Sequence, residues 1–563
     1  MISDKRHIQQ LAVLLLKKGI TDIVISPGSR NAPLINTFTG TDKFNCRNIV
    51  DERTAAYFAL GLALKRQNPV VLVCSSGTAA LNYVPAVAEA YYQNIPLIVL
   101  TADRPNYWID QAESQCIRQE NIYQNFTKKG ISLPLGESEK ELWFSARQIN
   151  ECLTLVTSGK QAPVHINIPL EEPLHKLVEE GLPEVKEIEL ARTQAHLTEI
   201  ELATLVYLFS RSRKTIILAG QMNPSFELKS TLSKLVDKTG AVVIGEHLAN
   251  ISNPRFCSSI DLLMTGILDE DPESYQPDLL ISFGGQFVSK SLKQFLRKNK
   301  PSQHWHISLD NEHFDTYQSL TKVINMKAID FFEALLKEGA QSNRRYLELW
   351  KNKEAKLNQQ RDQFIKGIEF CDLKAFGQIV KTIPLSSVIH LGNSSPVRYG
   401  LIHEVVTNAH YLSNRGTAGI DGCLSTAVGF ASASDQLNTI ILGDLSFFYD
   451  SNALWNKYIG SNLRIIVIHN GGGNIFGMIK GPADSPAYNE HFFAENTHKA
   501  EVLAKAFDLD YFKAEDEDEL TKALKKFYSP SQKKVALLEI FTNAEINSRL
   551  FRELFSFVKT KQN

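Results

Sequence analysis

The chain has 563 residues, of which 43% are hydrophobic and 22% are charged, and its formal net charge is −1. At about 150 residues per domain this length predicts three or four domains, and the composition is typical of an ordinary soluble globular protein. The net charge gives no electrostatic reason to expect binding to nucleic acid or to an anionic membrane. The charged N-terminus and the short apolar run 11–16 predict neither a signal peptide nor a membrane-spanning helix. Seven scattered cysteines without a Cys-x-x-Cys pair predict free thiols in a cytoplasmic protein.

Residues 1–185 alternate short apolar runs with longer amphipathic stretches. This alternation is typical of a parallel sheet whose strands are connected by helices. The predicted strands are 22–25, 70–74, 96–100 and 164–168, and the predicted helices are 8–17, 52–66 and 78–93. We therefore expect a doubly wound α/β domain at the N-terminus.

The segment Asp51-Glu52-Arg53 lies between Ile49-Val50, which has the character of a strand end, and the predicted helix 52–66. A carboxylate is favoured near a helix N-terminus by the helix dipole. Local sequence therefore leaves two interpretations of Glu52 open, an acid that starts a helix and a functional carboxylate.

Two further units of the same kind follow a linker at about 170–195 that is rich in charge and proline. The second unit, to residue 355, has predicted strands at 215–218, 241–244, 279–283 and 304–308, and ends in a strongly charged stretch, 343–365, interpreted as a solvated connecting helix. The third unit has predicted strands at 388–391, 410–412, 439–442, 464–468 and 535–540. The predicted fold class is therefore α/β, with three consecutive doubly wound parallel-sheet domains.

Two neighbouring strands of the third unit end in residues with oxygen-bearing side chains. One strand runs into Gly443-Asp444, and the next runs into Asn470 and the glycine run 471–473. Open α/β sheets bind ligands at the carboxyl ends of their strands. Carboxylate and amide oxygens suit Mg²⁺, and glycines allow a backbone carbonyl to approach closely. We predict a Mg²⁺ ion that holds a diphosphate, with Asp444, Asn470 and the carbonyl of Gly472 as ligands.

Arginines recur in the loops that follow predicted strands. They are Arg30, Arg104, Arg118, Arg398 and Arg415. A single loop arginine is usually a surface charge, but five in a nearly neutral protein predict recognition of several carboxylates, which a guanidinium pairs bidentately. Lys290 is a weaker candidate of the same kind, and a solvated lysine is the alternative interpretation.

Six sequence blocks occur in order: SPGSR (26–30), TADRP (101–105), SQCIRQ (114–119), GNSSPVR (392–398), SNRGTAGIDG (413–422) and GDLS with NGGGNIF (443–446 and 470–476). Together they resemble the 2-succinyl-5-enolpyruvyl-6-hydroxy-3-cyclohexene-1-carboxylate (SEPHCHC) synthase family, which uses thiamine diphosphate in menaquinone synthesis. The resemblance spans nearly the whole chain. His469 departs from the paired asparagines of thiamine-diphosphate enzymes, Leu445 stands where a glycine is usual, and Ser291 stands where a second basic residue often occurs.

The resemblance implies three domains, namely a pyrimidine-binding domain (1–185), a central domain (186–355) and a diphosphate-binding domain (356–563). It implies a transferase that decarboxylates 2-oxoglutarate and adds the succinyl carbanion in 1,4-fashion to isochorismate, with thiamine diphosphate and Mg²⁺, or Mn²⁺, as cofactors. It also implies a homodimer or a dimer of dimers with active sites between subunits, in which Glu52 hydrogen-bonds the pyrimidine ring and activates the cofactor.

The resemblance further implies roles for individual positions. The cofactor-binding positions are Glu52, Thr78, Ser394, Ile420, Gly443, Asp444, Leu445, Ser446, Asn470, Gly472, Asn474 and Ile475. The substrate-binding positions are Ser29, Arg30, Arg104, Gln115, Lys290, Ser394, Arg398, Arg415 and Phe476. Ile420 would bend the cofactor, and core packing is its alternative. The departure at His469 is expected to leave the metal ligands unaffected.

Other interpretations of the sequence stay open. An acetolactate synthase-like enzyme that acts on pyruvate would need fewer arginines, and a thiamine-diphosphate fold without catalysis would not need Glu52. A dinucleotide-binding enzyme is disfavoured because Gly284-Gly285 ends a strand without a G-x-G-x-x-G fingerprint.

Overall fold

The computed structural model describes residues 1–179, 181–191, 195–268, 271–309, 311–338, 343–406, 408–479 and 481–560. The chain divides into two compact units. Unit 1 comprises residues 1–192, 414–435 and 449–460, and unit 2 comprises residues 193–413, 436–448 and 461–563. The predicted linker 170–195 includes this division, and its residues 180 and 192–194 lie outside the described part of the chain.

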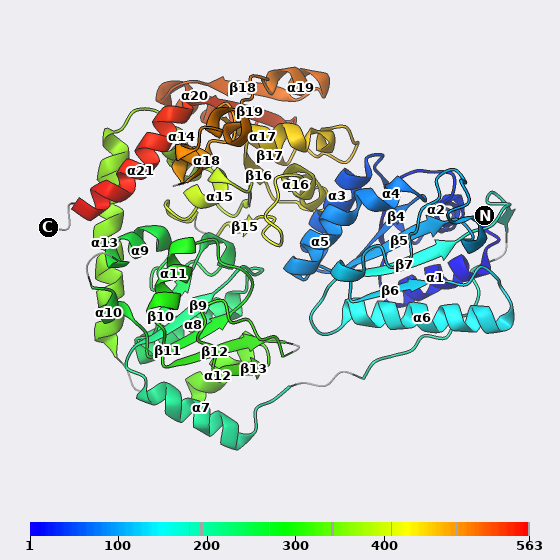
Figure 1. Ribbon diagram of the computed structural model, residues 1–563, viewed down its shortest axis with the longest axis horizontal. Helices are drawn as coiled ribbons and strands as arrows, with labels where there is room; N and C mark the ends of the chain where they lie inside the picture. The colour runs from blue at the N-terminus through cyan, green and yellow to red at the C-terminus, as the bar shows by residue number, and fades with distance from the viewer. Residues whose placement is uncertain are drawn as a thin grey trace. The chain divides into compact units, whose positions relative to one another are not determined.

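Unit 1 is built on a six-stranded parallel sheet with the strand order β3-β2-β4-β5-β7-β6 (Figure 1). The strands are β2 (Asp22–Ile25), β3 (Asn45–Asn48), β4 (Val70–Cys74), β5 (Leu97–Asp103), β6 (Lys129–Ser132) and β7 (Val164–Pro169). The helices that accompany them are α1 (Arg6–Lys17), α2 (Ala32–Thr39), α3 (Glu52–Arg66), α4 (Thr78–Asn82), α5 (Val84–Gln93) and α6 (Glu139–Thr157). The predicted helix 78–93 is thus two helices, because Pro85 in the first turn of α5 has no backbone N–H to continue the ladder from α4.

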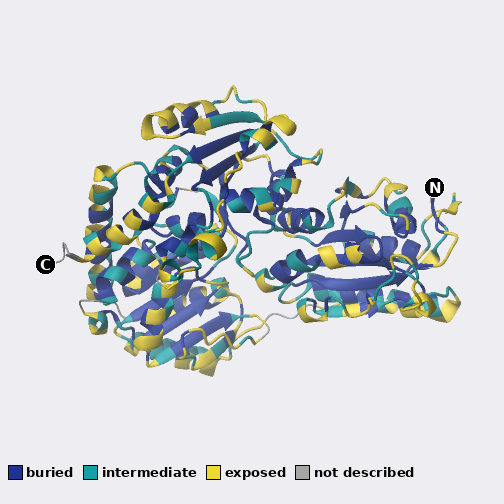
Figure 2. Cartoon of the chain, turned by 45° about the horizontal axis from the view of Figure 1, so that its top comes forward, coloured by how far each residue is buried: buried dark blue, intermediate teal, exposed yellow. Residues whose placement is uncertain are grey.

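The apolar strands of this sheet are buried on both faces, and Figure 2 shows them in dark blue. This explains why β2, β4 and β5 are mostly apolar in the sequence. The edge strands β3 and β6 carry polar residues, and the sequence analysis did not predict them. A small antiparallel pair, β1 (Ile2–Ser3) with β8 (Leu177–Val178), completes unit 1.

Unit 1 also contains α16 (Cys423–Ala431), which comes from late in the chain and packs against α3. Two glycines allow this contact. A Cβ at Gly61 would lie 2.0 Å from the carbonyl oxygen of Thr426, and a Cβ at Gly429 would lie 2.0 Å from that of Phe58. The two helices therefore touch backbone to backbone, and this contact holds the segment 414–435 on the N-terminal sheet.

Unit 2 contains two parallel sheets. The five-stranded sheet has the order β10-β9-β11-β12-β13, with strands β9 (Thr215–Ala219), β10 (Val242–Gly245), β11 (Leu279–Phe283), β12 (Gln303–Ser308) and β13 (Lys322–Asn325). The six-stranded sheet has the order β15-β14-β16-β17-β19-β18, with strands β14 (Val388–Leu391), β15 (His410–Leu412), β16 (Asn438–Gly443), β17 (Leu463–His469), β18 (Asp510–Ala514) and β19 (Ala536–Phe541).

The helices of unit 2 connect these strands (Figure 1). The longer ones are α7 (Glu199–Arg211), α8 (Phe226–Thr239), α9 (Ile260–Leu268), α11 (Lys290–Lys298), α12 (Ala328–Glu338), α13 (Arg344–Gly367), α14 (Asp372–Thr382), α20 (Glu517–Phe527) and α21 (Ala544–Thr560). The shorter ones near the strand ends are α15 (Ser395–Tyr399), α17 (Asp444–Tyr449), α18 (Ile475–Met478) and α19 (Glu501–Ala506). One continuous apolar core includes residues from both sheets of this unit.

The prediction that 343–365 forms a solvated connecting helix is wrong in one respect, because one face of helix α13 is buried. Its residues Tyr346, Trp350, Glu354, Leu357 and Arg361 are buried. They recur every three or four positions, which is the spacing of a single helix face. The many charged residues of this helix conceal a buried stripe that joins the unit 2 core.

The predicted fold class is confirmed, because all three large sheets are parallel and are connected through helices. All seven cysteines are free thiols, as predicted. Among the described residues, no helix has the length and apolar character needed to cross a bilayer.

Candidate active site

Strands β16 and β17 place Asp444 and Asn470 at the same edge of the six-stranded sheet. The strands are parallel neighbours, and their register runs from Asn438 opposite Leu463 to Gly443 opposite Ile468. Asp444 therefore follows the last residue of β16, and Asn470 follows the last residue of β17. Their exposed fractions are only 1% and 7%. An acidic and an amide side chain are thus buried together at the carboxyl edge, where such sheets bind ligands.

Asn496 connects the two strand ends, and the sequence analysis did not identify it. Its side-chain Nδ2 donates to Asp444 Oδ2 at 3.1 Å, and its backbone N–H donates to the carbonyl of Gly471 at 2.8 Å. Nothing in the surrounding sequence distinguishes this asparagine from a loop residue. Its role depends on a long-range approach of the segment after α18 to the strand ends.

Two buried amide atoms at this edge have no hydrogen-bond partner among the described residues. Asn470 donates its Nδ2 to Asp372 Oδ2 at 2.8 Å, which leaves its Oδ1 without a partner. Asn474 accepts at Oδ1 from the Ser548 hydroxyl at 2.8 Å, which leaves its Nδ2 without a partner. Buried polar atoms are nearly always paired. A free acceptor suits a cation and a free donor suits a phosphate oxygen, so the residues present fit a Mg²⁺–diphosphate group.

Asp444 carries an electrostatic signature of this site. Burial raises the pKa of Asp444 to about 6, although His469 and Asn496 oppose the increase. Removing a carboxylate from water disfavours its charged form, and a bound cation would restore that form. The described residues contain no cluster of three or more His, Cys, Asp or Glu side chains that could hold a metal ion. The predicted ligand set is of another kind, because it has one carboxylate, one amide oxygen and one backbone carbonyl.

His469 is closer to the ligands than the sequence analysis expected. Its Nε2 lies 3.9 Å from Asp444 Oδ2, and its Nδ1 lies 2.7 Å from Glu539 Oε1. Burial lowers the pKa of His469, but the hydrogen bond to Glu539 and the charge of Asp444 outweigh burial and raise this pKa overall. The departure from the paired asparagines therefore places an imidazole, with its charged form favoured by Glu539 and Asp444, beside a predicted metal ligand.

The glycine run packs against another part of the same chain. Gly471 has φ +84°, and a Cβ at Gly472 would lie 2.6 Å from the carbonyl oxygen of Phe493. Gly473 donates its backbone N–H to the same carbonyl. The carbonyl of Gly472, a predicted ligand, accepts from the backbone N–H of Asn474 at 2.9 Å and keeps a second lone pair. The glycines were predicted to allow a ligand to approach the backbone closely. In this structure residues 492–494 make that close approach.

The remaining predicted positions of unit 2 lie on several elements. Ser394 follows β14, the neighbour of β16, and has φ +74° at the start of α15. Arg398 donates to the carbonyl of Ser394 at 3.1 Å, and burial lowers the pKa of Arg398. Lys290, by contrast, is exposed at the start of α11. The hydroxyl of Ser291 donates to Asp261 at 2.6 Å, so this position pairs with an acid in place of the basic residue.

Ile475 and Phe476 begin the short helix α18 after the glycine run. Ile475 is buried and Phe476 is half-buried, with its ring centroid 5.7 Å from that of Phe492. On the other strand end, Gly443 and Leu445 are partly buried on either side of Asp444, and Ser446 is buried.

Unit 1 holds the predicted catalytic acid at the first position of α3. Asp51 caps this helix by accepting from the backbone N–H of Thr54 at 2.8 Å, which leaves the half-buried Glu52 carboxylate without a hydrogen bond among the described residues. Both neighbours of Glu52 are anchored. Asp51 accepts from Asn452 Nδ2 at 2.6 Å, and Arg53 donates to the carbonyl of Tyr449 at 2.7 Å. Glu52 is therefore a free acid on a fixed piece of backbone.

The turn after β4 contains more unpaired polar atoms. The hydroxyls of Ser75 and Ser76 are buried and have no partner among the described residues. Gln119 is buried beneath this turn and accepts from the backbone N–H of Gly77 at 2.8 Å. Thr78 begins α4 with an exposed side chain, and Gln115 is also exposed. The turn has the polar groups expected of a ring-binding site, and Gln119 supports it from below.

The structure brings two predicted arginines of unit 1 together. Burial lowers the pKa of Arg30, and the charge of Arg104 lowers it further. Arg30 donates to the carbonyl of Leu170 at 3.0 Å, and Arg104 lies 3.2 Å from Glu113. Ser29 beside them is exposed. Arg30 also lies 3.4 Å from Glu172, so each guanidinium group has a carboxylate partner of the kind that it would pair with in a substrate.

Arg118 does not join this pair. Its side chain is 81% exposed and lies 2.8 Å from Asp110. This geometry is that of a surface ion pair.

The loop that carries Arg415 and Ile420 belongs to unit 1. Both side chains are partly buried. The buried carboxylate of Glu89 on α5 accepts from the backbone N–H groups of Gly416 and Thr417 at 2.7 and 2.6 Å. The sequence analysis did not identify Glu89, because an acid within an apolar helix carries no motif of its own.

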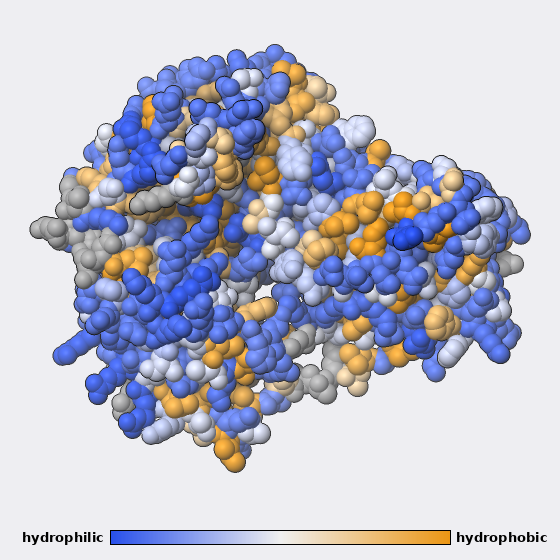
Figure 3. Space-filling model, in the orientation of Figure 1, coloured by the Kyte–Doolittle hydropathy of each residue, from blue (hydrophilic) through white to orange (hydrophobic). Residues whose placement is uncertain are grey.

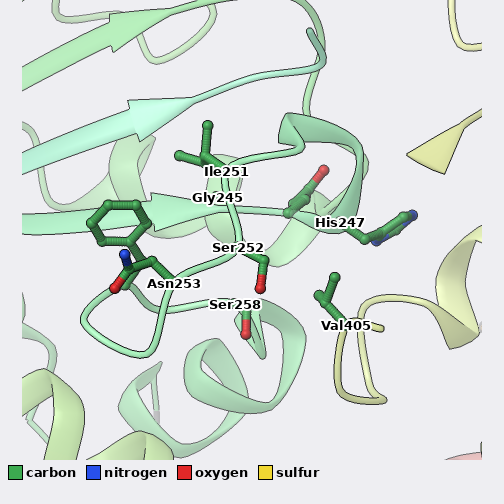
Figure 4. Close-up of a pocket in the computed structure, with 9 residues that line it drawn as sticks. Gly245, His247, Ile251, Ser252, Asn253, Ser258 and Val405 are labelled. Carbon is green, nitrogen blue, oxygen red and sulfur yellow. The ribbon is translucent and has the colours of Figure 1, made fainter. Parts of the chain in front are cut away.

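A separate small pocket occurs in unit 2 near the end of β10 (Figure 4). Its lining includes His247, Ile251, Ser252, Asn253 and Val405. None of the predicted site residues lines this pocket, and we assign it no role.

Comparisons with known proteins agree with this geometry. The family model "Thiamine pyrophosphate enzyme, N-terminal TPP binding domain" matches residues 6–122, and thiamine pyrophosphate is another name for thiamine diphosphate. The model "Middle domain of thiamine pyrophosphate" matches residues 186–390, and "Thiamine pyrophosphate enzyme, C-terminal TPP binding domain" matches residues 397–540.

Curated relatives are similar over the full length. The chain is 39% identical to a SEPHCHC synthase of Bacteroides thetaiotaomicron, with 100% of each chain covered. It is 40% identical to the SEPHCHC synthase of Flavobacterium johnsoniae, with 97% of this chain and 98% of the relative covered. It is also 40% identical to that of Desulfotalea psychrophila, with 90% and 93% covered. The chain therefore belongs to the SEPHCHC synthase family of thiamine-diphosphate enzymes, and it is a thiamine-diphosphate-dependent enzyme of the transferase class.

Proposed function

We propose that this enzyme decarboxylates 2-oxoglutarate and adds the resulting succinyl unit in 1,4-fashion to isochorismate, which releases SEPHCHC and carbon dioxide in menaquinone synthesis. The observation that carries this proposal is the placement of Arg30 after β2 and of Arg104 after β5, the two strands that flank β4 in the sheet of unit 1. Both substrates are dicarboxylates, and planar guanidinium groups bind carboxylates bidentately. The relatives' name denotes a product with succinyl, enolpyruvyl and carboxylate groups, which agrees with such a site.

In this proposal, Asp444, the Oδ1 of Asn470 and the carbonyl of Gly472 hold Mg²⁺, or Mn²⁺, against the diphosphate. The support is the buried Asp444 carboxylate and the free Asn470 acceptor beside it. The free Nδ2 of Asn474 donates to a phosphate oxygen. Gly443, Leu445, Ser446, Ile475 and Ser394 line the same edge of the sheet. Thiamine diphosphate, when bound, supplies the electron sink for decarboxylation.

Glu52 is the proposed catalytic acid. Its carboxylate accepts no hydrogen bond among the described residues, while both neighbouring residues are anchored. It exchanges a proton with the pyrimidine ring of the cofactor, which is the role of a positioned acid–base group. Thr78 and the loop residue Ile420 hold the ring in place.

The proposed substrate groups are Arg30 and Arg104 with Ser29 and Gln115 from unit 1, Arg415 from the loop that Glu89 holds, and Arg398, Ser394, Phe476 and Lys290 from unit 2. The partly buried arginines suit carboxylates, because a buried guanidinium needs an anionic partner, and a substrate carboxylate could take the place that Glu172 and Glu113 hold at Arg30 and Arg104 in this structure. Lys290, which is exposed, is the least supported member of this set.

The active site is proposed to lie between subunits of a homodimer or a dimer of dimers. In unit 1, apolar side chains gather on the surface where α4 lies (Figure 3). Leu81 of α4 is 45% exposed, and Val50, two residues before Glu52, is 53% exposed. Apolar residues exposed beside a catalytic acid are typical of an interface. We retain the three domains 1–185, 186–355 and 356–563, and the free thiols support a cytoplasmic location.

The test compares carbon dioxide release from 2-oxoglutarate and from pyruvate by the purified enzyme with thiamine diphosphate, Mg²⁺ and isochorismate. We expect release from 2-oxoglutarate with stoichiometric consumption of isochorismate, and release from pyruvate about 10- to 100-fold slower, since a lost charged contact costs about 1.5–3 kcal/mol. Faster release from pyruvate would support the acetolactate synthase-like alternative. A fully loaded enzyme without any turnover would support a non-catalytic thiamine-diphosphate fold.

A further inference from the structure

Asp372 is a fully buried carboxylate at the start of α14 that pairs with no cation among the described residues. All of the groups that contact its carboxylate are neutral donors. Asn470 Nδ2 and the Tyr399 hydroxyl donate to Oδ2 at 2.8 and 3.2 Å, and the Thr542 hydroxyl donates to Oδ1. A buried charge without a counter-ion is costly, so its retention requires a physical reason.

The hydrogen bonds around Asp372 determine which of its neighbours donate and which accept. Asn547 donates its Nδ2 to the Thr542 oxygen at 3.0 Å, so the Thr542 proton is directed to Asp372. The backbone N–H of Asp372 in turn donates to Asn547 Oδ1 at 2.8 Å. The Oδ1 of Asp372 therefore acts as an acceptor, and its Oδ2 accepts from the Asn470 amide and the Tyr399 hydroxyl.

We propose that Asp372 is a positioning residue for the cation site, because it sets which atom of the Asn470 amide faces the metal. The oxygen and nitrogen of an amide are nearly identical in shape, so only hydrogen bonding selects between the two orientations. The orientation present places Nδ2 on Asp372 and leaves the buried Oδ1 free. The reverse orientation would place two acceptors against each other and turn an NH₂ group towards the cation.

This arrangement also gives the buried charge a function. A carboxylate directly behind a metal ligand favours binding of a dication, and outer partners of this kind orient ligands in many metal sites. The inference rests on the proposed assignment of Asn470 as a metal ligand. It extends that assignment to a residue that does not touch the metal, and Asp372 lies outside all the motifs found in the sequence.

The test measures Mg²⁺ affinity by titration calorimetry in the presence of thiamine diphosphate, with Mn²⁺ electron paramagnetic resonance as a second probe. For Asp372→Ala we expect a 10- to 100-fold loss of affinity. Saturating Mg²⁺ should then restore thiamine-diphosphate binding. If this variant does not fold, Asp372→Asn replaces it; its amide keeps the volume but can donate to Asn470 Oδ1, and we expect about a tenfold loss.

Tyr399→Phe is the matched control, because it removes another donor to the same carboxylate and leaves the Asn470 contact intact. We expect its Mg²⁺ affinity to stay within about twofold of the parent, although its unfolding temperature falls. A loss of affinity equal to that of the Asp372 variant would show that Asp372 acts only through general stability and would overturn the inference.

A double mutant then separates the two proposals. If Asp372 acts through Asn470, adding the Asp372 substitution to an Asn470→Ala protein should change its Mg²⁺ affinity by no more than about twofold. An undiminished effect in that background contradicts the positioning role. If Asn470→Ala and Asp444→Ala both leave Mg²⁺ affinity unchanged, the cation site itself is wrong, whatever the Asp372 variants do.

Discussion

The carboxylate of Glu89 accepts hydrogen bonds from both the backbone N–H and the hydroxyl of Thr417, each at 2.6 Å. The backbone N–H of Gly416 adds a third at 2.7 Å. This buried acid on α5 thus holds the loop between Arg415 and Ile420, one a proposed substrate residue and the other a proposed cofactor residue. A helix of the N-terminal sheet in this way sets the position of a loop from late in the chain.

Glu89→Gln should weaken this anchor. One acceptor oxygen becomes an NH₂ group that faces a backbone N–H, and an unsatisfied buried donor costs about 1–3 kcal/mol. We expect a lower free energy of unfolding and a roughly tenfold higher KM for the carboxylate substrates through displacement of Arg415, with a smaller change in kcat. Steady-state kinetics and urea unfolding measure both quantities.

Gln93→Ala is the control for this prediction, because Gln93 donates to the Glu89 carboxylate from the same helix, α5. Its KM should stay at the parent value. An unchanged KM in Glu89→Gln, together with lost stability, would contradict the anchoring role.

Glu52→Gln should abolish most of the turnover. The amide keeps the shape of the side chain but cannot exchange a proton with the cofactor, and acid–base groups contribute about 10²- to 10⁴-fold to rate. We expect kcat to fall within that range while the affinity for thiamine diphosphate stays within a few-fold of the parent. Turnover and cofactor titration measure the two effects.

Glu139 provides the matched control for Glu52, because it is also the first residue of a unit 1 helix, α6. If Glu52 were only an acid that starts a helix, Glu52→Gln and Glu139→Gln would have equally small effects on kcat. That result would remove Glu52 from the mechanism.

Asp444→Asn should weaken cation binding. Removing one partner of a buried ion pair costs about 3–5 kcal/mol, which is at least about a 100-fold change in affinity. We expect the Mg²⁺ concentration that gives half-maximal activity to rise by that factor. Asp508→Asn, at an 87%-exposed acid of the same unit, should leave it unchanged. Thiamine-diphosphate binding with unaltered Mg²⁺ dependence in Asp444→Asn would refute the metal assignment.

Strands buried on both faces could be predicted from the sequence, since β2, β4, β11 and β14 are short runs in which at most one residue is polar. Edge strands such as β3, with the sequence NCRN, could not, because only one side of such a strand is paired and its residues need not be apolar. The error at α13 has the opposite cause. Its charged residues dominate the composition, while its buried stripe is apparent only from helical spacing.

The site could be predicted where function requires a local pattern, as at Asp444 and the glycine run. Asp372, Glu89 and Asn496 could not, because each acts through at least one partner more than fifty positions away. A single acid or amide in a helix or loop has many ordinary explanations. Only the fold shows that these three side chains hold the strand ends and loops that carry the motif.

Arg104→Met should impair recognition of the carboxylate substrates. A hydrogen-bonded charge contributes about 1.5–3 kcal/mol, so KM for 2-oxoglutarate should rise by about 10- to 100-fold. Arg118→Met removes a guanidinium from an exposed ion pair and should change KM by less than about twofold. Equal effects of the two variants would indicate a general loss of positive charge and not a specific site.

Stability should fall as pH rises from about 4 to about 7, and Asp450 should account for part of this fall. Burial raises the pKa of Asp450 to about 7, although its hydrogen bonds to Ser425 oppose the increase. Between the ordinary carboxyl pKa near 4 and the raised value, the folded state binds a proton that the unfolded state does not bind, so the free energy of unfolding decreases with pH. The decrease is on the order of 4 kcal/mol for this group, and it is complete above the folded-state pKa.

Asp450→Asn stays neutral at every pH and should flatten the stability profile between about pH 4 and 7. Its side chain can still accept from the Ser425 backbone N–H and donate to the Ser425 hydroxyl. Asp435→Asn, at an exposed acid, should leave the slope unchanged. Urea unfolding at half-unit pH intervals measures the slopes; a parent-like slope in Asp450→Asn would show that the Asp450 carboxyl does not cause the pH dependence.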